Sequence, residues 1–127
     1  MVIDPSAIVA ILLREPGWEQ FLQAIERDPI KLIAMPSVLE LHMITQSRFG
    51  AEGVREMEFF LLKVGIQKVA MDENQLLWAT YAFNKFGKGL HPAGLNFGDC
   101  FSYALSKTSG ESLLFKGADF SKTDLPS

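Results

Sequence analysis

Apolar and polar residues alternate along this chain in blocks that predict short buried strands separated by amphipathic helices. Strands are expected where short apolar runs are bounded by turn residues, at residues 1–3, 30–34, 66–71 and 112–116. Helices are expected where apolar residues recur every three or four positions, at residues 7–13, 18–27, 36–48, 54–63, 72–86 and 97–107. Two helices follow each of the first three strands, and this order predicts an α/β fold with a mainly parallel sheet flanked by helices on both faces.

Capping residues mark several of these boundaries. Gly65 follows a predicted helix, where a glycine C-cap is common. Asp72 precedes the next helix and Gln75 stands three residues later, which predicts a capping box. Because capping already explains Asp72, we leave this acid out of the candidate site.

The stretch from Leu95 to Lys107 contains the most informative helix. Its apolar residues have the spacing of one buried face: Phe97, Cys100, Phe101, Ala104 and Leu105. Asp99 lies in the first turn of this helix, on an otherwise apolar or small-residue surface. The helix dipole alone favours a carboxylate there, so a capping role and a functional role are both consistent with its position.

Composition narrows the classes of protein. The chain has 127 residues, of which 48% are hydrophobic and ten are phenylalanine, and this content predicts one domain over residues 1–127. A net charge of −3 gives no general attraction to nucleic acid. The single cysteine, Cys100, excludes an internal disulfide or a multi-cysteine zinc site and suggests a reduced thiol in the cytoplasm. No apolar run approaches the length of a membrane span, and Met1-Val2-Ile3 meets Asp4 too soon for a signal-peptide core, so we expect no membrane association.

Four acidic residues stand where predicted strands end or the following helices begin. Asp4 and Asp119 follow strands, and Glu40 and Asp99 lie in the first turns of helices. The carboxyl ends of parallel strands share one edge of a sheet, so the predicted fold would bring these four side chains together. Asp4, Glu40 and Asp99 each have a simpler explanation as a helix cap or as a charge that compensates the helix dipole.

Clustered carboxylates need a compensating charge, because like charges about 4 Å apart repel by several kcal/mol even at an effective dielectric constant near 20. The donors would all be oxygen atoms, which favours Mg²⁺ or Mn²⁺ over zinc. His42 follows Glu40 by two positions and faces away from it on a helix, so we expect a structural histidine. A cation held by carboxylates suits phosphodiester hydrolysis and reconciles an acidic protein with a polyanionic substrate.

A glycine-rich segment, residues 87–94, directly precedes the Asp99 helix. It lacks the spacing of a phosphate-binding Walker loop. Lys88 in this segment, Lys116 and also Lys107 are candidates for contacts with substrate phosphate groups. The simpler explanation for each is an exposed lysine in solvent.

Four segments spread over the chain carry a family resemblance. They are Val2-Ile3-Asp4-Pro5-Ser6-Ala7-Ile8, Ser37-Val38-Leu39-Glu40, Asn96-Phe97-Gly98-Asp99-Cys100 and Leu114-Phe115-Lys116-Gly117-Ala118-Asp119-Phe120. Each segment alone is a weak signal. Together, in this order and over essentially the whole chain, they resemble the motifs of PIN-domain ribonucleases, and most of all the VapC toxins of VapBC toxin–antitoxin modules.

This resemblance implies a three-layer α/β/α PIN fold and a metal-dependent endoribonuclease that cuts RNA as the toxin of a type II toxin–antitoxin module. It also implies a homodimer and a cognate VapB-like antitoxin that inserts a segment into the acidic pocket. The residues that match the family's metal-binding acids are Asp4, Glu40, Asp99 and, at a more variable position, Asp119. Ser6 and Asn96 match its supporting polar residues.

Two positions depart from the family pattern. Pro5 stands where the family usually has threonine or serine, and proline removes a hydroxyl and a backbone donor. Ala118 stands where the closing motif often has a second acid. An alternative expectation is therefore a catalytically weakened module that binds antitoxin or RNA. A phosphotransferase with Asp4 as nucleophile is a further alternative, although Ser6 replaces the second acid of such enzymes.

Overall fold

Four parallel strands form the centre of the protein in a computed structural model that describes residues 1–126. They are β1 (Val2–Ile3), β2 (Leu32–Ala34), β3 (Gln67–Val69) and β4 (Leu113–Leu114), and they lie in the order β3–β2–β1–β4. Val2 pairs with Leu32 on one side and with Leu113 on the other. The predicted parallel sheet is confirmed, and β1, which leads directly to Asp4, lies inside it.

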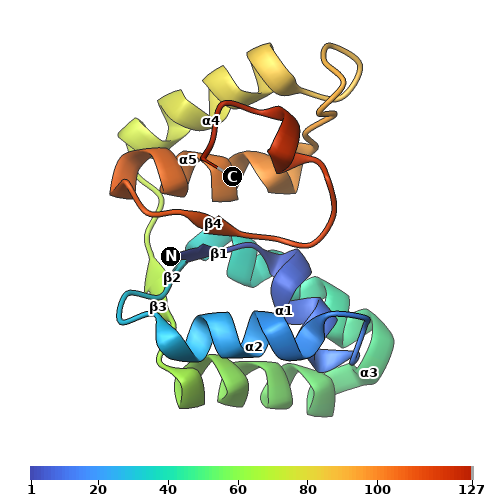
Figure 1. Cartoon of the computed structure of the whole chain (residues 1–127). Coiled ribbons are helices and arrows are strands. Elements are labelled where there is room, and N and C mark those ends of the chain that lie inside the picture. The colour runs from blue at the N-terminus through green and yellow to red at the C-terminus, as the bar shows by residue number, and fades with distance from the viewer. Residues whose placement is uncertain (127) are drawn as a thin grey trace.

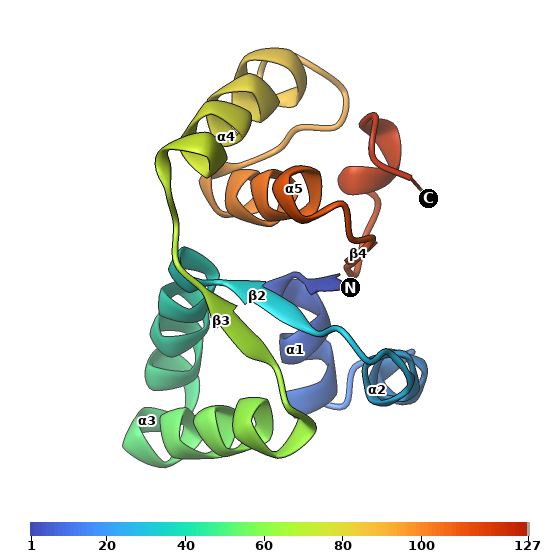
Figure 2. The same ribbon diagram turned by 90° about the vertical axis from the view of Figure 1, so that its left-hand side faces the viewer.

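Helices cover both faces of the sheet, as Figures 1 and 2 show. α4 (Glu73–Phe86) and α5 (Phe97–Ser109) lie on one face, and α1 (Pro5–Leu12), α2 (Trp18–Arg27) and α3 (Met35–Val64) lie on the other. A short 3₁₀ helix, η1 (Phe120–Lys122), follows β4. Within residues 1–126, none of the helices is both long enough and apolar enough to cross a membrane. The three-layer α/β/α arrangement is confirmed.

Alternate residues of each strand point to opposite faces of the sheet and build two separate cores. Ile3 and Ile33 pack with α1, α2 and α3 in one core, whereas Val2 and Ala34 pack against Leu105 of α5. Helices cover both faces of the sheet. The carboxyl ends of the strands are therefore where a ligand can approach, as in other open α/β sheets.

The end of α3 and the break within it agree with the sequence prediction, but its start differs and changes the position of Glu40. Gly65 ends the helix with a φ of 80°, as its predicted C-cap role requires. Gly50 leaves the helical conformation with a φ of 69°, so α3 consists of two helical segments, as predicted. The helix already begins at Met35, because Pro36 fits its first turn. Glu40 therefore lies in the second turn, and its predicted place in the first turn is wrong.

Two other helix starts also differ from the prediction. Asp72 caps α4 by accepting a hydrogen bond from the backbone N–H of Gln75 (2.8 Å), but the Gln75 side chain donates to Ala70 O, so the predicted capping box is wrong. Phe97 is 80% exposed and does not belong to the buried stripe of α5. The first turn of α5 is less buried than its later turns, where residues 102–106 are all buried.

Candidate active site

The carboxyl ends of β1 and β4 and the amino-terminal end of α5 meet at one edge of the sheet, on the right in Figure 1. Asp4 directly follows β1, Asp119 lies in the segment after β4, and Asp99 lies in the first turn of α5. Glu40 reaches the same edge from α3, where it contacts the start of α5. The structure thus brings the four predicted acids to one edge from four separate elements.

Asp4 is an enclosed acid, with 5% of the residue exposed. Its Oδ2 accepts a hydrogen bond from the backbone N–H of Ser6 (3.0 Å), which caps α1, and its Oδ1 accepts one from the Ser102 hydroxyl (2.6 Å). Burial raises the pKa of the Asp4 carboxyl, the two serines oppose that rise, and the charge of Asp119 adds to it. The same carboxylate therefore caps a helix and interacts with another acid.

Ser6 connects Asp4 to the segment after β4. Its hydroxyl oxygen accepts a hydrogen bond from the backbone N–H of Lys116 (2.9 Å), three residues before Asp119. Pro5 occupies the first position of α1, where its missing N–H costs no helical hydrogen bond. Asp4 therefore has two hydrogen-bond donors despite the neighbouring proline.

Glu40 approaches α5 at a glycine. A Cβ added to Gly98 would lie 3.0 Å from Cδ of Glu40 and closer still to Oε1, so the carboxylate occupies the space that a larger residue would need. Gly98 directly precedes Asp99, and the contact places Glu40 at the amino-terminal end of α5, where the helix dipole favours negative charge. Burial raises the pKa of Glu40, and the charge of Asp4 adds to that rise.

Asp99 is both a helix cap and a neighbour of the other acids. Its backbone N–H donates to Oδ1 of Asn96 (2.9 Å), and its Oδ2 accepts from the backbone N–H of Asn96 (3.1 Å), which forms a reciprocal capping box. Burial raises the pKa of Asp99 to about 7, the Asn96 hydrogen bond opposes this rise, and the charges of Asp4, Asp119 and Glu40 add to it. Asn96 thus holds Asp99 in place from both directions.

Asp119 differs from the other acids because it is exposed. It stands at the start of η1 and makes no side-chain hydrogen bond that caps this turn. Its charge nevertheless contributes to the raised pKa of both Asp4 and Asp99. Asp119 therefore lies at the rim of the site.

We refer to Asp4, Glu40, Asp99 and Asp119 as the acidic group. No three Asp, Glu, His or Cys side chains within residues 1–126 are arranged closely enough to hold one metal ion. The donor chemistry still fits a hard divalent cation, since every candidate ligand is a carboxylate oxygen. The raised pKa of three of these acids means that they are costly to ionise without a nearby positive charge, which a divalent cation would supply.

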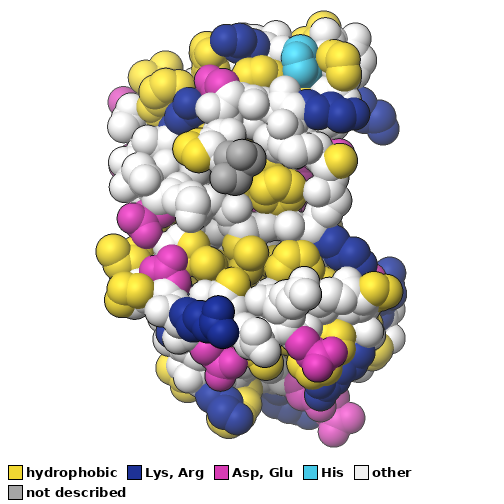
Figure 3. All heavy atoms as spheres, in the orientation of Figure 1, with side chains coloured by type: hydrophobic (Ala, Val, Ile, Leu, Met, Phe, Trp, Pro, Cys, Tyr) yellow, Lys and Arg dark blue, Asp and Glu magenta, His cyan; other side chains and the backbone are white. Residues whose placement is uncertain are grey.

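The three candidate lysines have different surroundings. Lys88 is exposed in the loop after α4. Lys116 is exposed just after β4, and its ammonium pairs with Glu15 (3.0 Å). Lys107 pairs with Asp124 (3.3 Å) in the last turn of α5, at the end of that helix far from the acidic group. Figure 3 shows Lys and Arg side chains, in dark blue, above and below a hollow at the right-hand edge of the molecule, so a polyanion approaching this edge would meet positive charge.

His42 lies outside the acidic group. Its Nε2 contacts Oε1 of Glu58 at 2.6 Å, and Lys68 pairs with the same carboxylate at 2.8 Å. These contacts join the two segments of α3 to β3. The structure therefore gives His42 a structural contact, in line with the interpretation of the sequence.

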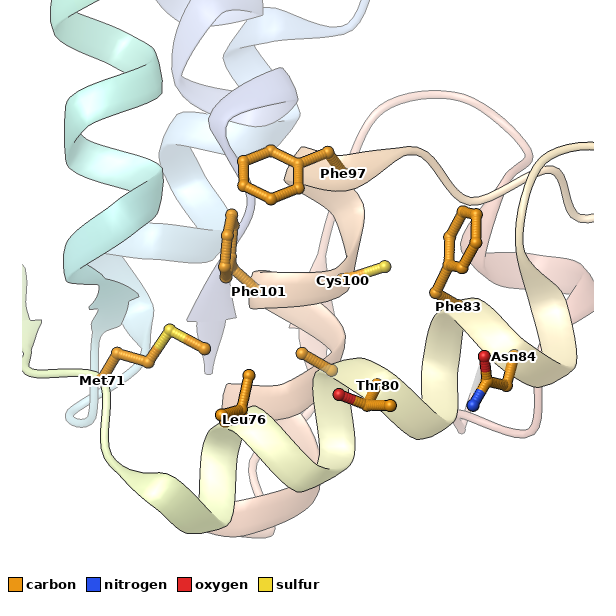
Figure 4. A pocket seen from close by; sticks show the side chains of 9 residues that line it. Met71, Leu76, Thr80, Phe83, Asn84, Phe97, Cys100 and Phe101 are labelled. Carbon is orange, nitrogen blue, oxygen red and sulfur yellow. The ribbon is translucent and has the colours of Figure 1, made fainter.

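A groove of about 480 Å³ lies between α4 and the first turns of α5 (Figure 4). The buried thiol of Cys100 points into it toward Phe83. Its other apolar lining includes Met71, Leu76, Phe97 and Phe101. The groove contains no member of the acidic group, so it is a candidate contact surface and not a catalytic pocket.

Sequence reasoning missed two residues of this site. Ser102 stands one turn after Asp99 and donates its hydroxyl to Asp4. A polar residue next to an apolar stripe, three positions after a candidate acid, is the signal that could have found it. Gly98 leaves room for the Glu40 carboxylate, and a glycine directly before a candidate acid is a weaker signal of such a close approach.

Comparisons with known proteins concern the family and the fold of this chain. A family model described as PIN domain matches residues 1–125. Ribonuclease VapC30 of Mycobacterium tuberculosis is 48% identical over 125 residues, which cover 98% of this chain and 95% of that protein. Ribonuclease VapC of Mycolicibacterium smegmatis is also 48% identical over 125 residues, which cover 98% of this chain and 97% of that protein.

One solved structure is similar in fold. The crystal structure of VapC20 of Mycobacterium tuberculosis, described as a sarcin–ricin loop cleaving toxin, has a TM-score of 0.79 against this chain. The match covers 98% of this chain and 95% of that one at 12% sequence identity. At this identity the likeness concerns the fold alone.

Proposed function

Because the chain belongs to the PIN-domain family and its relatives include VapC ribonucleases, we propose that it is a metal-dependent endoribonuclease and the toxin of a type II toxin–antitoxin module. It acts in the cytoplasm as a single PIN-like domain over residues 1–127 and cleaves RNA by hydrolysis. The observation that carries this proposal is the acidic group, whose four carboxylates come from four elements and act on one another through their charges.

In this proposal Asp4, Glu40, Asp99 and Asp119 hold Mg²⁺ or Mn²⁺ through their carboxylate oxygens. When bound, such a cation acidifies a water molecule and neutralises negative charge on the phosphate. One of the three inner acids, Asp4, Glu40 and Asp99, takes up the proton that the attacking water loses. Asp119 closes the group on the side that faces solvent.

The RNA backbone lies along the edge where the strands end, and Lys88 and Lys116 contact its phosphate groups. Lys116 is already paired with Glu15, so it exchanges one anionic partner for another, and we expect it to contribute less than Lys88. Ser6 and Asn96 support the site through their hydrogen bonds to Asp4 and Asp99.

Two protein partners are part of the proposal: a second copy of this chain and a VapB-like antitoxin that covers the acidic group. Met35, Leu39 and Met43 stand four residues apart on α3, and all three are exposed. They form an apolar stripe that a second copy would bury. Light scattering should give the mass of a dimer for the wild type and of a monomer for Leu39→Asp.

Cleavage of a mixed pool of structured and single-stranded RNA tests the proposed activity. Wild-type protein should cut RNA with Mg²⁺ or Mn²⁺ and leave it intact with EDTA, and Asp99→Asn should not cut under any of these conditions. Circular dichroism checks that both proteins are folded. An uncut pool in every condition, with folded wild-type protein, would overturn the proposal.

A second candidate function is a module of the same fold that binds antitoxin or RNA and hydrolyses RNA poorly. Pro5 and Ala118 favour it, as does the spacing of the acids, since no three potential ligands within residues 1–126 are close enough to hold an ion. Pro5→Thr separates the two functions. Because Asp4 already has two donors, we expect this change to alter the rate by less than about tenfold, the value of one hydrogen bond. Cleavage by Pro5→Thr alone would favour the weakened module.

A further inference from the structure

Ser102 makes a contact that the packing of α5 does not require. The residue is fully buried, and its hydroxyl donates a 2.6 Å hydrogen bond to Oδ1 of Asp4, 98 positions away in the sequence. An apolar or small residue at this position would satisfy the packing between α5 and the sheet. The feature that distinguishes serine from such a residue is its hydrogen bond to the Asp4 carboxylate.

The hydrogen bond joins two elements of the proposed site. Ser102 lies three residues after Asp99, so the two side chains are neighbours on one face of α5. The bond from Ser102 thus links the helix that carries Asp99 to the strand end that carries Asp4. The backbone N–H of Ser6 donates to the other oxygen of Asp4 at 3.0 Å. With one donor on each oxygen, the carboxylate cannot rotate without losing a hydrogen bond.

We propose that Ser102 is a positioning residue: its hydroxyl fixes the Asp4 carboxylate in the orientation in which Asp4 shares a divalent cation with Asp99. This inference rests on the proposed function. Each oxygen of an ionised carboxylate has two lone pairs, so a cation and the hydroxyl can occupy different lone pairs of the same oxygen. Residues that orient a metal ligand in this way typically change the affinity for the metal by about 10- to 100-fold.

Ser106 supplies a matched control on the same helix. It stands four residues after Ser102, it is also buried, and its hydroxyl also donates a 2.6 Å hydrogen bond. Its acceptor is the backbone oxygen of Glu111, outside the acidic group. Ser102→Ala and Ser106→Ala each remove one buried hydroxyl and one short hydrogen bond, so both should lower folding stability, with the larger loss for Ser102→Ala because its acceptor is a carboxylate. Only Ser102→Ala removes a contact with an acid.

Binding of Mn²⁺ to the metal-free protein, without RNA, is the decisive measurement. Electron paramagnetic resonance of free Mn²⁺ gives the affinity, and urea unfolding gives the stability of each variant. Ser102→Ala should weaken Mn²⁺ binding by about 10- to 100-fold, whereas Ser106→Ala should bind like the wild type. Ser102→Thr keeps the hydroxyl and should restore most of the affinity.

RNA cleavage provides the second measurement. For Ser102→Ala, the Mn²⁺ concentration that gives half of the maximal rate should rise by the same factor as the dissociation constant. The rate at saturating Mn²⁺ should recover toward that of the wild type, because the acids themselves are unchanged. If Ser102 had only a structural role, its replacement would lower folding stability without raising the Mn²⁺ concentration for half-maximal rate while sparing the rate at saturating Mn²⁺.

The outcomes distinguish this inference from the proposed function. Equal Mn²⁺ affinities of Ser102→Ala and Ser106→Ala would overturn the role of Ser102, even if the wild type cleaves RNA. Absence of cleavage by the wild type would overturn the proposed function, while the comparison of Mn²⁺ affinities would still test Ser102. Absence of Mn²⁺ binding by the wild type would overturn both. If Ser102→Ala does not fold, Ser102→Cys replaces it, and an unchanged affinity of that variant, whose thiol is a weak donor, would contradict the inference.

Discussion

The inner and outer acids of this site are held in opposite ways. Asp4 is the N-cap of α1, and Asp99 completes the capping box that Asn96 begins on α5. Hydrogen bonds from Ser6 and Ser102 hold the Asp4 carboxylate, and one from Asn96 holds that of Asp99. Asp119 is exposed and makes no such bond to η1. Burial raises the pKa of Asp4 and of Asp99, so ionisation of these two carboxyls lowers the folding stability of the protein. The fold therefore fixes the positions of Asp4 and Asp99 through hydrogen bonds, whereas no capping hydrogen bond fixes the side chain of Asp119.

The largest expected effect is on the rate of RNA cleavage, and it distinguishes the inner acids from Asp119, the outer acid. Asp4→Asn should lower the rate of RNA cleavage by about 1,000-fold, because it removes a charge from an enclosed position where solvent cannot replace it. Asp119→Asn should lower the rate by about tenfold, because an exposed carboxylate interacts more weakly through solvent. Single-turnover cleavage measures both rates, and circular dichroism checks the fold. Equal losses in the two variants would remove the distinction between inner and outer acids.

The next effect tests how Glu40 reaches the inner acids. Gly98→Ala should lower the cleavage rate by about 10- to 100-fold, because the new Cβ displaces the Glu40 carboxylate. Stability should change little, since alanine favours a helix. Gly110→Ala is the matched control. It should cost about 1 kcal/mol of stability at a φ of 74°, with unchanged activity, because open space surrounds that position. Wild-type activity of Gly98→Ala would contradict the contact.

A smaller effect concerns the cost of ionising the inner acids. In the metal-free protein, folding stability should fall as pH rises from about 4 to about 7. Asp99 has a pKa of about 7 in the folded state against an ordinary value of 3.8, so in this window the folded state holds a proton that the unfolded state has released. The raised pKa values of Asp4 and Glu40 act in the same direction.

Urea unfolding in EDTA at several pH values between 4.5 and 7.5 measures this slope. Asp99→Asn should decrease it, because the variant lacks the titrating carboxyl. A wild-type slope equal to that of Asp99→Asn would mean that Asp99 ionises freely in the fold.

The smallest effect is expected outside the acidic group. His42→Ala should leave the cleavage rate within about twofold of the wild type and lower stability by at most about 1 kcal/mol, because its half-exposed contact with Glu58 is structural. Single-turnover cleavage and urea unfolding measure the two quantities. A large loss of activity in a variant of unchanged stability would give His42 a functional role.

The sequence was sufficient for the order of elements and for the positions of Asp4 and Asp99 at element boundaries. Asp4 and Asp99 stand at element boundaries, and boundaries are set by local signals such as turn residues and caps. The same local signals predicted the C-cap at Gly65, which the structure confirms. Local patterns therefore located the edge of the sheet where the site lies.

The two omitted residues, Ser102 and Gly98, make contacts between distant parts of the chain. The bond from Ser102 to Asp4 spans 98 positions, and no periodicity of one helix can reveal it. The place of Glu40 depends on the absence of a side chain at Gly98, which belongs to another element. Phe97 has the spacing of a core residue, but its side chain lies at the surface in the first turn of α5, where its ring packs edge-on against that of Phe101.

Thermal unfolding with and without Mn²⁺ tests whether the inner acids are arranged for a divalent cation. At pH 7.5, Mn²⁺ at one hundred times its dissociation constant should stabilise the wild type by about 2.7 kcal/mol. At about 4 °C per kcal/mol, this corresponds to a rise in Tm of about 10 °C. Asp4→Asn should be folded and show no such rise. An equal rise in both proteins, or none in the wild type, would contradict the claim.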